Sequence, residues 1–361
     1  MSADGELRWT AARLHQTLAA AFAARGVDAE VAAQVADCLV EASLRGVDTH
    51  GVALVPTYLA ELDGGRAKAQ PRWREQGSGA LRRLDAAGAL GVVAACRAAD
   101  RAAQLAEDLG LGAVVVAGSN HCGPASAFSL RIARRGLVGL FCTNSDALVT
   151  PYGGRRRVFG TNPLSLAAGP VGTPLEPGAG GFCLDMATSQ VAFSRVRRTL
   201  AAGDSVDPGW ASFSPPESRD PDAAVLHPLG GEQGYKGQGL AMMVTLLTAV
   251  LAAEPVDAEL SHLFAPPYDR PRRVAHFVLA LNPRALGESD PEAFGRRLAG
   301  FLRSVRQEPP AEEDWEVMVP GDPEVRVAAR RVSAGVPLSA ELAAFFEALE
   351  GNPEAASPAG P

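Results

Sequence analysis

The chain has 361 residues, of which 47% are hydrophobic and 21% charged, and it carries a formal net charge of -7. These proportions are typical of a globular protein, and the length allows about two or three domains of ordinary size. The negative charge argues against nucleic acid or an anionic membrane as the main partner, because such surfaces need clustered basic residues. The one basic run, Arg155–Arg157, is too short to change this.

The five cysteines are scattered, odd in number and never spaced C-x-x-C. This pattern predicts neither a disulfide framework nor a metal site, and it favours a reducing compartment. No secretory signal is expected, since the residues up to Arg13 are polar and interrupted by charge. The longest apolar run, Leu240–Ala253, is shorter than the roughly 20 residues that span a bilayer. We therefore expect a cytoplasmic protein with no membrane contact, and a buried helix over this run.

Residues 7–75 are predicted to be helical. Apolar residues recur at helical spacing in the first segment, which ends near Gly26. Asp28 is expected to cap a second helix that runs towards Gly46, and Val55–Leu62 forms a third.

Beyond residue 80 short apolar runs of strand length alternate with alanine-rich helical stretches, which indicates an α/β core. The expected strands are Gly112–Ala117, Gly139–Thr143, Leu164–Ala168 and His276–Leu281. The expected helices are Ala89–Glu107, Ala125–Arg135, Asp290–Arg306 and Ala340–Glu350.

We divide the chain into an N-terminal helical part, a core and a C-terminal segment. The helical part, 1–78, is expected on the substrate side, packed with the C-terminal segment. The core, 79–310, is expected to bind the cofactor and to contain an exposed loop, 203–222, which is rich in Pro, Ser and Asp from Pro208 to Asp222. The segment 311–350 should contribute to the cofactor site, and 351–361 should form a frayed tail.

His50 lies in a polar stretch at the end of a predicted helix, between Gly46 and Gly51. A histidine in this position can be a cap that complements the helix dipole. Taken alone, it favours that structural role over a functional one.

His121 lies between small residues, directly after the strand that contains Val114–Val116. Loops at the carboxyl ends of strands are where α/β proteins bind ligands, and histidine can transfer protons near neutral pH. The alternative is that Ser119 or Asn120 merely caps the next helix.

Three further loops, at 143–146, 151–154 and 160–163, are rich in hydroxyl, amide and glycine residues. Such loops suit the pyrophosphate and riboses of a dinucleotide, although ordinary turns use the same residues. The stretches 185–189 and 234–239 add a lysine among glycines before a helix, which is an anion-binding arrangement. Neither the Walker nor the Rossmann glycine spacing is present.

Taken together, these stretches resemble the malate/L-lactate dehydrogenase family, which is unrelated to the Rossmann-fold lactate dehydrogenases. That family includes ureidoglycolate and sulfolactate dehydrogenases and reductases of Δ1-piperideine-2-carboxylate. Six motifs in the family's order carry the resemblance, which covers about residues 10 to 345: Leu44–Gly51, Ser119–Gly123, Gly160–Pro163, Asp185–Ser189, Lys236–Leu240 and Pro320–Glu324.

The resemblance implies a mixed-sheet dinucleotide-binding core of the non-Rossmann type, with a helical domain built from the N-terminal and C-terminal parts. It implies a homodimer, a small-molecule substrate, and NAD or NADP as cofactor, with the choice between the two left open. His121 is implied as proton donor or acceptor, with His50 and Tyr58 beside the substrate. The cofactor residues expected from the resemblance and its motifs are Ser145, Thr161, Asn162, Asp185, Met186, Ala187, Lys236, Gly321, Asp322 and Pro323.

Two positions depart from the family pattern. Leu54 stands where relatives usually carry an arginine that pairs with a substrate carboxylate, and Gln238 stands where they usually carry tyrosine. Leucine cannot make that charge-assisted contact. Either another cation serves, with candidates Arg270, Arg272 and Arg273, or the substrate has no free carboxylate.

Several functions therefore stay open. The chain can be a hydroxy-acid dehydrogenase, a cyclic imine reductase, or a reductase of a larger amide-linked or carrier-linked intermediate. Loss of the arginine also fits an inactive nicotinamide-binding homologue, and a purely structural protein is the third class. The run Arg155–Arg157 can meet a 2′-phosphate, but a solvated surface is its commoner role.

Overall fold

The computed structural model describes residues 7–170, 181–287, 290 and 292–355, so the end of the expected tail, 356–361, lies outside the described residues. At its centre is a seven-stranded mixed sheet in which only β3 and β4 run parallel. In spatial order the strands are β2 (Arg74–Ser78), β3 (Leu81–Asp85), β4 (Leu111–Ser119), β10 (Val274–Leu281), β5 (Val138–Thr143), β6 (Leu164–Ala168) and β7 (Phe182–Met186). The expected α/β core with a mixed sheet is confirmed.

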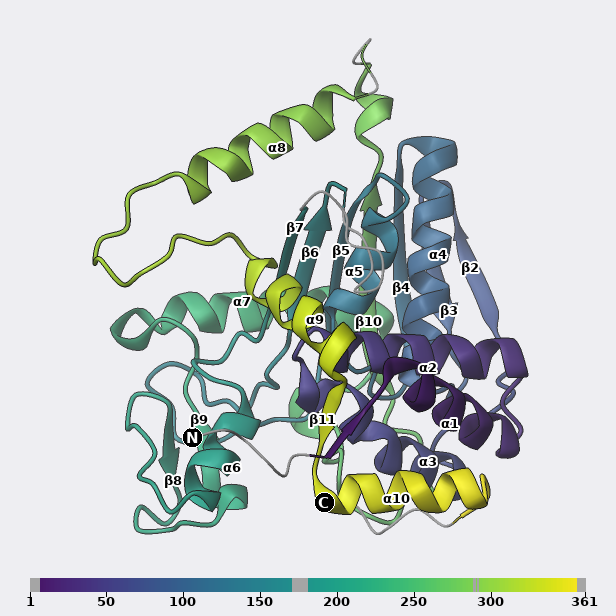
Figure 1. Ribbon diagram of the computed structural model, residues 1–361, viewed down its shortest axis with the longest axis vertical. Helices are drawn as coiled ribbons and strands as arrows, with labels where there is room; N and C mark the ends of the chain where they lie inside the picture. Colours follow the sequence, from purple (N-terminus) through teal and green to yellow (C-terminus); the bar gives the residue numbers. More distant parts are fainter. Residues whose placement is uncertain (1–6, 171–180, 288–289, 291, 356–361) are drawn as a thin grey trace.

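Two helices, α4 (Gly91–Leu109) and α5 (Ser126–Ala133), cover one face of the sheet (Figure 1). Most of the buried residues of α4 are alanines. This lets the helix approach β4 so closely that a β-carbon on Gly112 would overlap the Ala102 carbonyl oxygen. On the opposite face, Ala252 packs against Val115 and Ala275.

A helical layer lies beside the sheet and is built from both ends of the chain (Figure 1). Three of its helices begin at side-chain caps: the Thr10 hydroxyl accepts from the Arg13 N–H, the Asp28 carboxylate from the Glu30 N–H, and the Ser339 hydroxyl from the Leu342 N–H. The expected stop at Gly26 and cap at Asp28 are thereby confirmed. The layer contains α1 (Ala11–Ala24), α2 (Ala29–Leu44), α3 (Val55–Asp63) and α10 (Ala340–Gly351). A short antiparallel ladder between β1 (Leu7–Trp9) and β11 (Val336–Leu338) joins its two ends.

The remaining elements are short or lie at the periphery. They are η1 (Asp48–His50), η2 (Val52–Leu54), α6 (Phe193–Ala201), β8 (Ala211–Phe213), η3 (Pro221–Ala223), β9 (Ala224–Leu226), η4 (Gly231–Gln233), α7 (Tyr235–Thr245), η5 (Leu246–Val250), η6 (Asp257–Glu259), η7 (Pro283–Leu286), α8 (Ala293–Arg306) and α9 (Asp322–Ala334). Helix α8 runs along the outer edge of the molecule (Figure 1). None of the described helices is long and apolar enough to cross a membrane.

The helix predicted over Leu240–Ala253 is present, but the prediction that it is buried is wrong. A helix does run through this region, as α7 and the π-helical turn η5, but Met242, Leu246 and Val250 are more than half exposed. One side packs against the sheet while the other faces outwards. The apolar length of a run does not reveal which of its sides meets another element.

Two smaller expectations also fail. The stretch 208–222 is not only an exposed loop, because β8 lies within it, pairs with β9 and buries Ala211. Residues 7–75 are not wholly helical, since they include the edge strand β1 and the first residues of β2. Both are short strands whose pairing partners lie in distant sequence or in a hairpin without a strong alternating pattern.

Candidate active site

His121 lies in the loop that connects β4 to α5, and close backbone contacts hold this loop in place. A β-carbon on Gly91, the first residue of α4, would overlap the carbonyl oxygens of Asn120 and His121. Gly123 has a φ of 76°, a conformation that residues with a side chain rarely adopt. The loop can therefore take this course only because both positions are glycine.

Ser119 and Asn120 position this loop and do not cap the following helix, so the capping interpretation was wrong. The Ser119 hydroxyl bonds His276 Nε2 at 2.8 Å. The Asn120 amide donates to the Ala89 carbonyl at 2.9 Å, and its oxygen accepts from the Arg272 N–H at 3.1 Å. The loop preceding His121 is thus bonded to the start of α4 and to the start of β10.

The structure brings His50, Tyr58 and His121 together. The Tyr58 hydroxyl lies 2.7 Å from His121 Nδ1, and the ring centroids of His50 and His121 are 5.7 Å apart. His50 Nδ1 is bonded to the Thr49 hydroxyl at 2.9 Å. Helix α2 ends at Leu44, so His50 does not lie at its end; His50 is instead the last residue of the short helix η1, and Gly51 follows it.

The neighbours of His121 determine which of its ring nitrogens is free. The Gly123 N–H donates to Nδ1 at 3.3 Å, and the Tyr58 hydroxyl bonds the same atom. The Tyr58 hydroxyl can either donate to Nδ1 or accept from it, so Nδ1 is engaged in either tautomer of the neutral ring. Within the described part of the chain Nε2 has no hydrogen-bond partner, and His121 is only half-buried. Nε2 is the atom that can meet a substrate.

The surroundings keep His121 neutral. Burial lowers its pKa well below the ordinary value, and the nearby His50, Arg272 and His276 lower it further. Burial also lowers the pKa of His50 and raises that of Tyr58 well above its ordinary value. A neutral imidazole with a hydroxyl on one nitrogen and an open second nitrogen can accept a proton at neutral pH.

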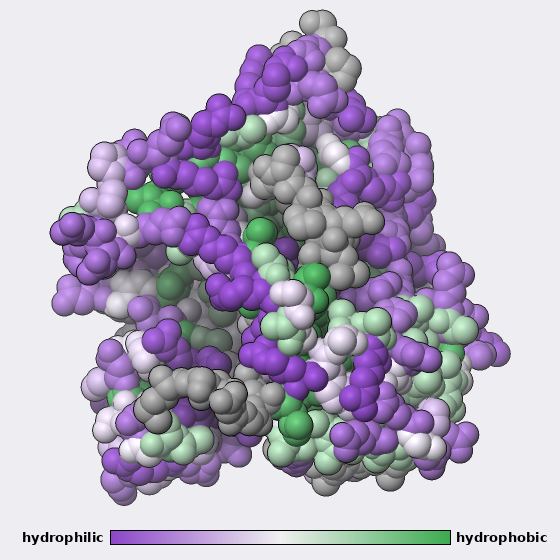
Figure 2. All heavy atoms as spheres, in the orientation of Figure 1, coloured by the Kyte–Doolittle hydropathy of each residue, from purple (hydrophilic) through white to green (hydrophobic). Residues whose placement is uncertain are grey.

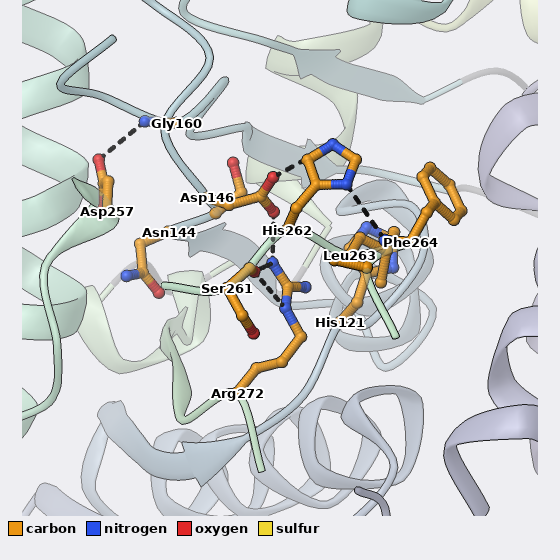
Figure 3. A network of polar contacts seen from close by, with 12 residues as sticks. His121, Asn144, Asp146, Gly160, Asp257, Ser261, His262, Leu263, Phe264 and Arg272 are labelled. Atoms are coloured by element: carbon orange, nitrogen blue, oxygen red, sulfur yellow. Dashed lines mark hydrogen bonds and ion pairs between the residues drawn. The ribbon is translucent and has the colours of Figure 1, made fainter. Parts of the chain in front are cut away.

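Three of the cofactor candidates converge at the ends of β5 and β6. The Ser145 hydroxyl accepts from the Thr161 N–H at 3.1 Å, and the Ser145 N–H donates to Asn162 Oδ1 at 3.2 Å. Asn162 is buried, with a φ of 38°, and its amide donates to Asp257 at 2.7 Å. Asp257 also accepts from the Gly160 N–H, as drawn in Figure 3. The Asn162 side chain therefore shapes this loop and is not free for a ligand.

Asp185, Met186 and the following Ala187 lie at the end of β7. The Asp185 carboxylate accepts from the N–H of Ser126, the first residue of α5, at 2.8 Å. This contact joins the end of β7 to the His121 loop. Two residues after Met186, the Thr188 N–H donates to the Thr161 carbonyl at 2.8 Å, so this strand end also meets the Ser145 group.

The last candidates approach from two other elements. Lys236 is exposed in the first turn of α7, and no carboxylate of the described residues forms an ion pair with it. Gly321, with a φ of 104°, lies against Cys183 of β7. The Asp322 carboxylate is held by Arg306 at 2.7 Å, and Pro323 follows it in the first turn of α9.

These residues fit a dinucleotide. Lys236 is an unpaired cation in the first turn of a helix, where backbone dipoles also favour an anion. Gly321 brings backbone close to β7, and Ser145 and Thr161 supply hydroxyls. Gly321 and Thr161 contact β7 and the residues that follow it, and Asp185 at the end of β7 bonds Ser126 at the start of α5, five residues after His121.

Sequence reasoning named Arg272 only as one of three candidate cations and Asp146 only as part of the loop 143–146, and it missed the buried His276. Arg272 forms an ion pair with Asp146, and His276 bonds both Ser119 and Thr143 across the sheet (Figure 3 shows the first pair). Burial lowers the pKa of His276 to about 3, so it is a neutral structural residue. The sequence indicated Asp146, because it directly follows the cofactor candidate Ser145 in a polar loop. Nothing in the sequence indicated His276, because it lies within an apolar strand.

A family model described as malate/L-lactate dehydrogenase matches residues 9–346. The chain belongs to the malate/L-lactate dehydrogenase family. As a member it is a dehydrogenase that uses NAD or NADP, and the choice between the two stays open. The family resemblance and the enzyme class expected from the six motifs are confirmed.

Relatives within this family are named for different substrates and cofactors. The chain is 36% identical to a (2R)-3-sulfolactate dehydrogenase (NADP(+)) of Chromohalobacter salexigens, over 83% of this chain and 92% of the relative. It is 31% identical to an Escherichia coli ureidoglycolate dehydrogenase (NAD(+)), over 85% and 86%. The structure of malate dehydrogenase from Pyrococcus horikoshii superposes with a TM-score of 0.85 and 26% identity, covering 99% of each chain.

Proposed function

We propose that this dehydrogenase interconverts a small 2-oxo and 2-hydroxy acid, or a related C=N compound and its amine, with His121 moving the proton. One observation carries the proposal: the rings of His50, Tyr58 and His121 meet around an open Nε2. The nearby loops, with Ser145 and Asp185, offer the cofactor a place beside that atom.

The bound nicotinamide supplies or accepts the hydride at the substrate carbon. The remaining steps belong to the chain. The ring reacts as the tautomer with its proton on Nδ1, which donates to the Tyr58 oxygen across their 2.7 Å separation. In oxidation Nε2, which then carries no proton, takes the hydroxyl proton and the ring becomes an imidazolium. In reduction the same imidazolium donates from Nε2 to the developing alkoxide or amine. Tyr58 can turn its hydroxyl in either sense, so it stabilises both charge states of the ring.

Leu54 favours a second candidate, a reductase of cyclic imines or of a substrate with no free carboxylate. Leu54 is buried at the start of α3, four residues from Tyr58, and it offers no charge to a substrate. Both candidates use the same proton transfer by His121, so they differ only in the group that undergoes reduction.

The test is an assay of purified protein with pyruvate, oxaloacetate, 3-sulfopyruvate and Δ1-piperideine-2-carboxylate, each with NADH and with NADPH. We expect turnover of at least one 2-oxo acid, measured as loss of absorbance of the reduced cofactor. Preference for the imine would select the second candidate.

Cofactor binding is measured in parallel from the thermal midpoint, because a ligand that binds only the folded protein raises it. Stabilisation by the cofactor without turnover of any of these substrates would contradict the proposal and identify an inactive homologue. No stabilisation by either cofactor would overturn the assigned cofactor residues.

We further propose that two copies of the chain form the homodimer that the family resemblance implies, and that they pair through α7 and η5. This face exposes several large apolar side chains in one stretch, which a monomer in water rarely does. They are Tyr235, Met242, Met243, Leu246, Val250 and Leu251. Apolar atoms also reach the surface beneath α8 (Figure 2), where Phe301 is exposed. The occupant we assign to this face is the same face of a second copy.

Light scattering tests this pairing. We expect the wild type at twice the 37.5 kDa of the chain, and Val250→Glu at the monomer mass, because a buried carboxylate would have no partner across the interface. Leu286→Glu, at an exposed residue of η7, should leave the dimer intact. A monomeric wild type, or a dimeric Val250→Glu, would show that α7 is not the interface.

We also place the protein in the cytoplasm. All five cysteines are free thiols, and burial raises the pKa of Cys142 and of Cys183 to about 12. Buried, protonated thiols with no disulfide partner are typical of a reducing compartment.

A further inference from the structure

Arg272 is a buried cation with an unused donor. It precedes β10, and its side chain is fully shielded from solvent. Its Nε and Nη2 atoms donate to the Ser261 carbonyl at 3.0 and 2.8 Å, and Nη2 also binds the Asp146 carboxylate. Nη1 has no partner. Buried guanidinium nitrogens almost always have an acceptor, so this one indicates a missing ligand atom.

Arg272 belongs to the His121 site. Its backbone N–H bonds the Asn120 side chain, one residue before His121, and its charge acts on both His121 and Tyr58. Asp146, its ion-pair partner, follows the cofactor candidate Ser145 along the chain. Figure 3 draws Arg272 bonded to Asp146 and Ser261, with His121 in the same view.

The other cations near the site are engaged or face solvent. Arg273 is exposed and pairs with Glu254, and Arg270 is also exposed. Arg66 is buried, and its Nη1 and Nη2 atoms donate to the carbonyls of residues 263, 265 and 267, although its Nε, like that of the buried Arg45, has no partner among the described residues. Of the three candidates for the missing arginine at Leu54, Arg272 alone is buried, and it is the one whose terminal Nη1 is unbonded.

The charges around Arg272 favour an anion. Asp146 balances one arginine, and Glu61 lies 3.6 Å from Arg66 Nη1 with both oxygens unbonded. Burial raises the pKa of Glu61 to about 7, so Glu61 ionises less readily than an ordinary glutamate. Its charge therefore offsets the two guanidinium groups less completely, and this favours an anion beside them.

We propose that Arg272 is the substrate-binding residue of this enzyme, and that its free Nη1 donates to a carboxylate carried next to the reacting carbon. This inference rests on the proposed function and deepens it, because it assigns the anion site that Leu54 cannot provide.

An anion bound to Arg272 would also change how easily His121 is protonated. His121 is surrounded by His50, Arg272, His276 and the Tyr58 hydroxyl, and the Arg272 charge opposes its protonation. An anion bound to Arg272 cancels part of that opposition. Binding of a carboxylate therefore makes His121 easier to protonate, as reduction requires, whereas a neutral substrate would not have this effect.

The test compares oxamate with oxamide, which has an amide in place of the carboxylate, on the complex with reduced cofactor. Binding is followed by quenching of the cofactor fluorescence. We expect the wild type to bind oxamate about 10- to 100-fold more tightly than oxamide, the range of a charge-assisted contact. Arg272→Gln should lose this preference, and Arg272→Lys should keep part of it.

Arg273→Gln is the matched control, because it removes a neighbouring arginine from the surface and should leave the preference unchanged. Arg272→Gln leaves Asp146 without its cation, so the double variant Arg272→Gln/Asp146→Asn is measured beside it. Unchanged binding of reduced cofactor shows that each variant is folded.

In Arg272→Gln the acid limb of the kcat/KM profile for oxidation should move to higher pH. The reason is that Arg272 lowers the pKa of His121, so its removal should raise that pKa.

Two results would overturn the proposal: a wild type that binds oxamate no better than oxamide, or an Arg272→Gln variant that keeps the preference. A wild type that shows the preference but turns over no 2-oxo acid would instead contradict the proposed function and leave the anion site standing.

Discussion

Replacement of His121 by alanine should lower kcat for the best substrate about 10²- to 10⁴-fold, the range that a positioned acid–base group contributes. Binding of the cofactor should change little, because the assigned cofactor residues make their contacts with other elements. Stopped-flow turnover and cofactor titration measure the two effects separately. His121→Gln, which can still bond Tyr58, should be equally slow and separates proton transfer from packing.

His15 provides the control, since it lies on the outside of α1 and pairs with Asp37 far from the site. His15→Ala should turn over at the wild-type rate. If His121→Ala keeps kcat within a few-fold, another group moves the proton and the proposed mechanism is wrong.

The pH dependence follows from the direction of the His121 pKa. Because the pKa is lowered, the neutral base persists to acidic pH, so kcat/KM for oxidation should stay level down to the ordinary histidine value of about 6.5 and fall only below it. In reduction the protonated form is needed, so kcat/KM should still be rising as the pH drops through that value. A profile from about pH 5 to about pH 9 in both directions measures this. Both limbs should be missing in His121→Ala.

Gly91→Ala should be the second most damaging change, although it adds a single methyl group to a helix. The added carbon would overlap the carbonyl oxygens of Asn120 and His121, which are backbone atoms and cannot turn aside. Either α4 or the His121 loop must shift. Overpacking of this kind costs about 1–3 kcal/mol of unfolding free energy. A displacement of the catalytic ring by about 1 Å can lower kcat about 10²-fold.

Gly300→Ala is the matched control, because this glycine lies within α8 and a β-carbon there meets no other atom. Alanine favours a helix over glycine by about 1 kcal/mol, so this variant should be at least as stable as the wild type. Urea unfolding and turnover are measured for both. A fully active Gly91→Ala of unchanged stability would show that the loop tolerates movement and that His121 is not held as tightly as the contacts indicate.

Much of the secondary structure of this chain follows from local sequence patterns. The apolar runs that became β4, β5, β6 and β10, and the helical spacing that became α1, α2 and α4, follow from periodicity and from caps such as Asp28. The position of His121 after β4 was also visible, because a polar loop directly follows a run of valines. The hydrophobic effect acts on these patterns in any fold that buries them, so they can be inferred without a partner element.

Other features depend on which elements meet, and no local pattern could reveal them. Arg270, Arg272 and Arg273 are the same residue type within four positions, yet only Arg272 is buried, because the chain turns into β10 at that point. The outer side of α7 stays exposed because the sheet covers only its other side. Burial and ion pairing are properties of the assembled layers.

The residues, their spacing and their order along the chain determined the family, the α/β core and the histidines that could do the chemistry. The tertiary structure decided that Tyr58 would lie against His121 and that the spare cation would be Arg272. The physical reason is that a hydrogen bond or a buried charge acts over a few ångströms of space, whereas these residues are separated by 63 and 151 positions of sequence, the differences between their numbers.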